Sequence, residues 1–142
     1  MKQMIPNSQI RDSSSKIIFG DPHLCSQFLR GYVNIPLLKD VQPEDIEDVS
    51  ERYVHMFIEE RNSDVVKKVH LKGSETSLFL VSLIEHKSQV DYNVIMQILR
   101  YIVFIWEDYE KEKEREHSGI SKTKDFKYPP VLPIIYYDGT AD

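Results

Sequence analysis

The sequence has few features of a secreted, membrane-spanning or metal-cluster protein. Its 142 residues include one cysteine, Cys25, so the chain can form neither an internal disulfide nor a thiolate metal cluster. No apolar run approaches the roughly 20 residues that a membrane-spanning helix needs. The N-terminal stretch MKQMIPNSQIRDSSS lacks the apolar segment of a secretion signal. We therefore expect a cytoplasmic protein that does not interact with membranes.

The chain also lacks the excess of positive charge that is typical of nucleic-acid-binding proteins. Its formal net charge is −5, whereas binding to phosphates requires local positive charge. This argues against a broad basic surface. A narrow one is still compatible with the sequence, because Lys67, Lys68, His70 and Lys72 lie close together in the chain.

What the sequence does contain is enough apolar material for one domain, since 41% of its residues are hydrophobic. The residue patterns predict the order helix, three strands, helix, strand. The predicted elements are helices at 12–19 and 22–31, a helical turn within 43–49, strands at 52–58, 64–71 and 77–86, a helix at 91–117 and a strand at 131–137.

Three of these elements have distinctive patterns. The strand at 77–86 is almost continuously apolar, which indicates a central strand covered on both faces. Pro133 in the last strand indicates an edge position. The long helix has a wide apolar stripe, but its last turns, from Glu107 to His117, are almost wholly charged and should project into solvent.

The most apolar strand ends on three ionisable residues, Glu85, His86 and Lys87. Alternate strand residues share a face, so Glu85 and Lys87 project together and His86 points the other way. If the strand at Asp64 pairs antiparallel with it across a turn at Gly73, Asp64 lies near Glu85. Two close carboxylates are best tolerated around a divalent cation that prefers oxygen ligands, such as Mg²⁺. Lys87 could then stabilise charge on a phosphate or orient a water.

The pattern Glu/Asp-x-Lys is weak alone, because about one match is expected in a chain of this size. A second match, residues 125–127, lies in a polar linker without a preceding strand. The following helix adds Gln97 and Tyr101, which are four residues apart and share a face. The alternative is a core tyrosine with its hydroxyl at the rim, and a solvated Gln97 beside Arg100.

These residues resemble a known group of enzymes. Asp64, Glu85-x-Lys87 and Gln97-x-x-x-Tyr101 are similar to the motifs of the PD-(D/E)XK nuclease superfamily, and the last element is similar to that of its RecB-type exonuclease branch. The stretches DSSSKIIFGDPHLCSQFLRGY, RNSDVVKKV, LIEHKS, ILRYIVFIWEDYEKE and PPVLPIIYYDG resemble the Rpn family of recombination-promoting nucleases, often labelled PD-(D/E)XK nuclease family transposases. The resemblance covers nearly the whole chain.

The resemblance implies a restriction-endonuclease-like α/β fold, with a mixed central sheet flanked by helices, and a DNA endonuclease that uses Mg²⁺ or Mn²⁺. The implied site consists of two metal-binding carboxylates, Asp64 and Glu85, a metal-binding backbone carbonyl, that of His86, a catalytic lysine, Lys87, and two residues that orient the metal site or the DNA, Gln97 and Tyr101. Ser63 stands where the superfamily name has proline. Residues 1–11 are expected to be a flexible lead, and residues 12–142 a single nuclease-like domain from the N-terminal part of a longer protein.

Three functions stay open on the sequence. The first is a metal-dependent DNA endonuclease, for which a homodimer is also considered. The second is a catalytically degenerate domain of a mobile-element protein that binds DNA or another protein, in which Glu85 and Lys87 merely pair at a strand end. The third is an unrelated α/β interaction module whose apolar helix, at 92–106, forms a dimer face.

Overall fold

The computed structural model describes residues 19–54, 65–86 and 94–138, of which residues 54, 84–86 and 137–138 are described by their backbone alone. The elements are α2 (Pro22–Tyr32), the 3-10 turns η1 (Pro36–Leu38) and η2 (Pro43–Asp45), β1 (Ile46–Asp48), α3 (Ser50–Val54), β2 (Val65–His70), β3 (Ser77–His86), α4 (Val94–Glu116), the 3-10 turn η4 (Ile120–Lys122) and β4 (Val131–Asp138).

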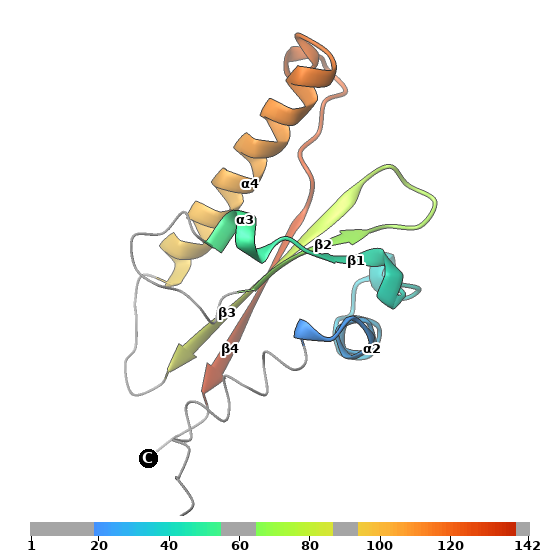
Figure 1. The fold of residues 1–142 in the computed structure, drawn as a ribbon, viewed down its shortest axis with the longest axis vertical. Coiled ribbons are helices and arrows are strands. Elements are labelled where there is room, and N and C mark those ends of the chain that lie inside the picture. The colour runs from blue at the N-terminus through green and yellow to red at the C-terminus, as the bar shows by residue number, and fades with distance from the viewer. Residues whose placement is uncertain (1–18, 55–64, 87–93, 139–142) are drawn as a thin grey trace, which may run out of the picture.

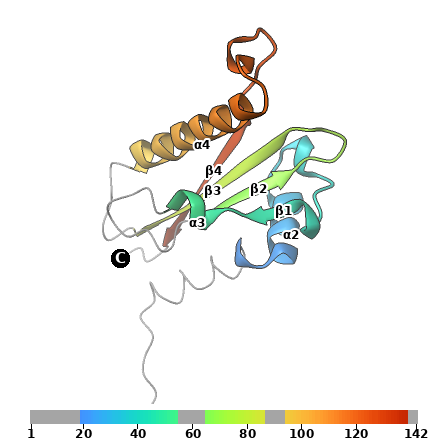
Figure 2. The same ribbon diagram turned by 45° about the horizontal axis from the view of Figure 1, so that its top comes forward.

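The strands form one mixed sheet in the order β1-β2-β3-β4 (Figure 1). β2 pairs antiparallel with both β1 and β3, whereas β3 and β4 pair parallel. The sheet lies between helices, with α2 on one face and α3 and α4 on the other (Figure 2). The described chain is therefore an α/β domain in which β3 is central and covered on both faces, as its apolar sequence predicted.

The core on the α2 face contains the apolar side of α2, a helix whose start is fixed by a capping residue. Asp21 caps the helix by accepting a hydrogen bond from the His23 amide at 2.8 Å, and Pro22 follows at the first helical position. Cys25 and Leu29 are then fully buried in this core. Cys25 is thus the small buried helix residue that the sequence suggested.

The core on the opposite face is built mainly by the first half of α4. Tyr101 and Ile105 are fully buried there and belong to one hydrophobic cluster with Val81 and Leu83 of β3. The second half of α4 extends past the sheet (Figure 1). One side of the apolar half is therefore buried against the sheet, and the charged half projects past the sheet as the sequence pattern predicted.

The turn between β2 and β3 sets the register of the sheet. Gly73 adopts φ 74°, a left-handed conformation that favours glycine, and the Ser74 amide donates to the Leu71 carbonyl at 3.2 Å. The adjoining pair is His70 with Ser77. The antiparallel hairpin predicted around Gly73 is therefore confirmed.

One predicted strand is wrong. Residues 50–54, which overlap the strand expected at 52–58, form the short helix α3, and residues 55–58 lie outside the described part. The strand that precedes β2 is instead β1, at Ile46–Asp48, directly after the predicted helical turn. The strand formers of α3 are accommodated because Tyr53 is buried between Phe79 and Phe104.

The segment after α4 returns along that helix before it enters the sheet. The Trp106 indole donates to the Pro129 carbonyl at 2.8 Å, and its ring packs on Tyr128. β4 then forms the edge of the sheet, which confirms the position indicated by Pro133. None of the helices within the described ranges is long and apolar enough to cross a membrane.

Candidate functional site

The carboxyl end of β3 is the centre of the candidate site. Glu85 and His86 are the last two residues of this strand, and their backbones pair with Tyr137 and Asp138 of β4. Their side chains lie outside the described part, as do Asp64 and Lys87 entirely. The predicted roles of these four residues therefore remain predictions.

Gln97 and Tyr101 are the predicted site residues whose side chains the structure describes. Both are buried on the sheet-facing side of α4, with exposed fractions of 2% and 0%, while Arg100 between them is exposed. The alternative interpretation is wrong for Gln97, which is not solvated, but its core tyrosine and its exposed Arg100 are confirmed. Gln97 and Tyr101 share a face as their spacing predicted. α4 begins near the carboxyl end of β3 and runs back along the sheet (Figures 1 and 2). Gln97, in the first turns, therefore belongs to the end of the sheet where β3 terminates.

The pairing of β2 with β3 bears on the position of Asp64. Val65, the first residue of β2, pairs with Ser82. The start of β2 therefore lies beside the part of β3 that leads to Glu85, since Glu85 is three residues beyond Ser82. This is the strand pairing that the prediction for Asp64 assumed.

Asp138 is a residue that the sequence reasoning did not place at this site. It ends β4, and its backbone pairs with that of His86. The carboxyl ends of parallel strands meet at one edge of a sheet, where α/β proteins commonly bind ligands. The signal in the sequence was the strand-helix-strand order from β3 to β4, which favours parallel pairing.

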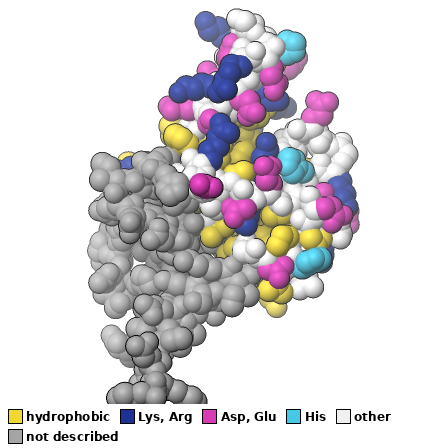
Figure 3. Space-filling view, in the orientation of Figure 1, with side chains coloured by type: hydrophobic (Ala, Val, Ile, Leu, Met, Phe, Trp, Pro, Cys, Tyr) yellow, Lys and Arg dark blue, Asp and Glu magenta, His cyan; other side chains and the backbone are white. Residues whose placement is uncertain are grey.

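The basic cluster on β2 is matched by acidic residues at the neighbouring edge. The ammonium of Lys67, which is 3% exposed, lies 3.3 Å from the Asp48 carboxylate. His70 Nε2 lies 3.4 Å from the Glu47 carboxylate, and the Lys72 ammonium lies 3.9 Å from the Asp45 carboxylate. Figure 3 likewise shows positive and negative side chains interspersed on one face of the molecule. This edge of the sheet therefore does not form the narrow basic footprint that the sequence left open.

Burial and charge shift the pKa values around Lys67. Burial disfavours the ionised form of Asp48, but hydrogen bonds from Ser50 and the charge of Lys67 outweigh it and lower the pKa of Asp48. On the α2 side, burial raises the pKa of Cys25 to about 11, although the Lys67 charge opposes the shift. The thiol is therefore protonated and unreactive at neutral pH.

α3 is attached to α4 through Asp108. One Asp108 oxygen, Oδ1, accepts from Arg52 Nη2 at 2.6 Å, and the other, Oδ2, accepts from the Tyr53 hydroxyl at 2.8 Å. Burial, followed by the hydrogen bond to Asp108, raises the pKa of Tyr53. The same carboxylate raises the pKa of Arg52, chiefly through its hydrogen bond. These contacts hold the C-terminal end of α3 against α4.

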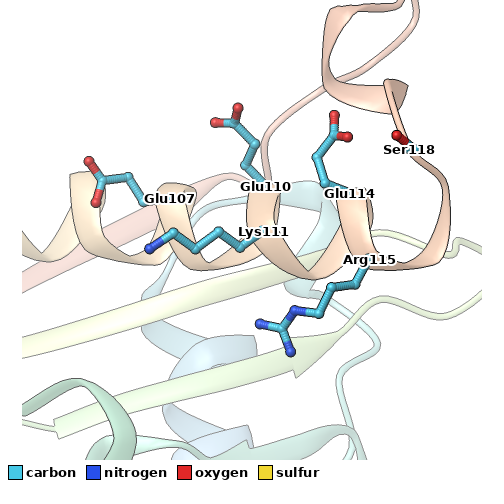
Figure 4. Close-up of a pocket in the computed structure, with 6 residues that line it drawn as sticks. All are labelled: Glu107, Glu110, Lys111, Glu114, Arg115 and Ser118. Carbon is cyan, nitrogen blue, oxygen red and sulfur yellow. The ribbon is translucent and has the colours of Figure 1, made fainter.

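A shallow hollow beside the C-terminal half of α4 offers no comparable site (Figure 4). Its acids, Glu107, Glu110 and Glu114, are spread along the exposed helix rather than gathered on one point. Glu114 is already used to close the following turn, because it accepts from the Gly119 and Ser121 amides at 2.6 and 2.8 Å. A hydrogen bond from the Ser121 hydroxyl, followed by these two from the amides, lowers the pKa of Glu114.

The second Glu/Asp-x-Lys match is also not a site. Asp125 and Lys127 are exposed in the segment between η4 and β4, and Phe126 between them packs on Tyr109 and Tyr128. Among the residues with described side chains, no group of three or more His, Cys, Asp or Glu residues is positioned to hold a metal ion.

The fold and the strand end at Glu85 define an α/β domain with a mixed four-stranded sheet and a candidate site where β3 and β4 end. Comparison with known families identifies it further. A family described as "Putative transposase, YhgA-like" matches residues 10–142. The chain belongs to this family, which is the recombination-promoting nuclease group that the sequence resembled. No curated protein and no solved structure matches the chain.

Proposed function

We propose that this domain is a metal-dependent DNA endonuclease whose active site lies at the carboxyl end of β3. The observation that carries the proposal is the position of Glu85 within the fold of a transposase-family protein. Glu85 is two residues beyond Leu83, which packs beneath α4. Strand alternation would therefore direct Glu85 to the face on which α4 buries Gln97 and Tyr101.

The register supports Asp64 as the second acidic residue. Continuing the β2–β3 pairing by one position would set Asp64 opposite Leu83, on the same face as Glu85 and one strand away. Two carboxylates and the His86 carbonyl form an all-oxygen donor set, which suits Mg²⁺ or Mn²⁺. A bound divalent cation would supply positive charge at the scissile phosphate.

The protein residues would then have separate roles in hydrolysis of a phosphodiester. A water oxygen forms a new bond to phosphorus and gives up a proton, while one bridging phosphorus–oxygen bond breaks and the departing sugar oxygen takes up a proton. Asp64, Glu85 and the His86 carbonyl would hold the cation, and Lys87 would stabilise the charge on the phosphate oxygens. Gln97 and Tyr101, which are buried on the sheet-facing side of α4, would position the acidic residues or the DNA.

A cleavage assay with plasmid and linear DNA tests the proposal. Mg²⁺ or Mn²⁺ should support cleavage by the wild type, and EDTA should abolish it. Asp64→Asn, Glu85→Gln and Lys87→Ala should each reduce the rate by about 100-fold or more. Asp125→Asn and Lys127→Ala provide a matched control, because they carry the same substitutions into the exposed second match and should leave the rate unchanged.

Equal cleavage by wild type and Asp64→Asn would refute the assigned site. If the wild type does not cleave, but binds DNA equally well with and without EDTA, the result would instead favour a catalytically degenerate DNA-binding domain. Both outcomes can be read from the same preparations when a fluorescence-anisotropy titration accompanies the cleavage assay.

A further inference from the structure

The first half of α4 is apolar on the side that faces away from the sheet as well as on the side that packs against it. Five residues, here called the α4 stripe, line the outward side and are between 37% and 66% exposed: Ile95, Met96, Leu99, Val103 and Trp106. Trp106 lies at the end of the stripe, where one part of its ring packs on Tyr128 and the rest is exposed. These five residues recur at helical spacing, directly opposite Gln97, Tyr101 and Ile105. A helix that is apolar all round is normally buried on all sides.

We propose that the α4 stripe is the contact surface of a homodimer in which the α4 helices of two copies pack antiparallel. A two-fold axis brings the same patch of both subunits together, so a stripe of this length can cover itself. Its midpoint lies near the level of Tyr101, so Leu99 of one copy would pack near Val103 of the other, and Met96 near Trp106.

The area of the stripe agrees with a weak dimer. At ~200 Å² for a fully exposed large side chain, the five residues leave about 500 Å² of apolar surface on each copy. Two copies would bury ~1,000 Å², the lower limit for a specific interface, before flanking side chains are counted. We therefore expect a dissociation constant on the order of 1–100 µM.

The charges beside the stripe favour the antiparallel arrangement. The second half of α4, from Glu107 to Glu116, carries more acidic than basic residues. A parallel pair would bring these two acidic halves together. An antiparallel pair centred near Tyr101 points them away from each other and aligns the helix dipoles favourably.

Sedimentation velocity over roughly 1–200 µM protein tests the proposal. The wild type should change from monomer to dimer with concentration. Leu99→Glu should weaken the dimer by at least about 100-fold, because the symmetric interface would bury two carboxylates without partners. Val103→Lys is a second variant at an exposed helix position, and circular dichroism confirms that both fold. Leu37→Glu is the matched control, since Leu37 is exposed on η1, away from the stripe.

Disulfide trapping tests the direction of the helices. When Leu99→Cys and Val103→Cys proteins are mixed and mildly oxidised, the mixed disulfide dimer should form in preference to either symmetric one, because the antiparallel register sets position 99 against position 103. A wild type that stays monomeric throughout, a Leu99→Glu variant that assembles normally, or equal disruption by Leu37→Glu would overturn the proposal. Symmetric disulfide dimers formed in preference to the mixed one would overturn the antiparallel arrangement.

Discussion

Asp108 is expected to hold α3 on α4, and its removal should destabilise the domain measurably. Its carboxylate is 17% exposed and accepts hydrogen bonds from Arg52 and from the hydroxyl of Tyr53, a residue that is 4% exposed. A hydrogen bond between a buried hydroxyl and a carboxylate contributes about 1.5–3 kcal/mol. The Arg52 pair contributes about 0.2–1 kcal/mol, because the Arg52 side chain is half exposed. Asp108→Ala should therefore lower the free energy of unfolding by about 2–4 kcal/mol.

Urea unfolding followed by circular dichroism measures this difference. Tyr53→Phe should account for most of the loss, and Arg52→Ala for less than about 1 kcal/mol. A double-mutant cycle of Tyr53→Phe with Asp108→Ala should give a coupling of about 1 kcal/mol or more. The control is Tyr128→Phe, because Tyr128 also donates to a carboxylate of α4, that of Glu110 at 2.9 Å, but on the exposed surface. This variant should unfold at the urea concentration of the wild type.

The same contact should be visible in the alkaline stability of the domain. The pKa of Tyr53 is raised in the folded state, first by burial and then by the hydrogen bond to Asp108. Its contribution is therefore complete below the unfolded pKa of about 10 and is lost as the pH rises above that value. Tyr53→Phe should lose less stability than the wild type above about pH 10. Greater destabilisation by Arg52→Ala than by Tyr53→Phe, or a coupling near zero, would refute this account of the α3–α4 contact.

Two further predictions concern the interior of the α2 face. Lys67→Met should leave the free energy of unfolding unchanged or raise it by about 1 kcal/mol. Asp48→Ala should lower the free energy of unfolding, because it leaves the buried Lys67 ammonium without its carboxylate. A Lys67→Met variant that is less stable to urea than Asp48→Ala would contradict the ion-pair geometry. The lowered pKa of Asp48 contributes stability above its unfolded pKa of about 4 that is lost as the pH falls below it. Cys25 should not react with a thiol reagent in the folded protein at pH 8, since burial raises its pKa to about 11; reaction as fast as in urea would disprove that burial.

The elements with long, regular patterns could be predicted from the sequence, and the short ones could not. α4 and β3 were identified because many residues repeat the same period. At residues 52–54 local strand propensity was misleading, because Tyr53 gains more from burial beneath α4 and from Asp108 than from a place in a strand. Tertiary contacts made by residues more than fifty positions away decide the structure of such a short segment.

β1 is a second short element whose structure depends on tertiary contacts and not on its own sequence pattern. Its three residues, Ile46–Asp48, include two acids and have no strand signal of their own. They form a strand because Glu47 and Asp48 pair in register with Lys68 and Lys67 of β2. The acidic residues that lie beside Lys67 and Lys68 are thus about twenty positions earlier in the chain, so the sequence alone does not reveal this pairing. Lys67, the buried member of the basic cluster, therefore neutralises Asp48 at the edge of the sheet.

The candidate site could be predicted in outline because it depends on two simple periodicities. Strand alternation and the turn at Gly73 relate Glu85 to the start of β2, and the four-residue repeat of α4 relates Gln97 to Tyr101. What joins these two sets is the parallel connection from β3 through α4 to β4. Because such a connection returns the chain to the same end of the sheet, the last residues of β3, the first turns of α4 and Asp138 converge at one edge. With Asp64 before β2, a nuclease site at this edge would therefore draw on four separate parts of the chain, and Asp138→Asn belongs beside Glu85→Gln in the cleavage assay.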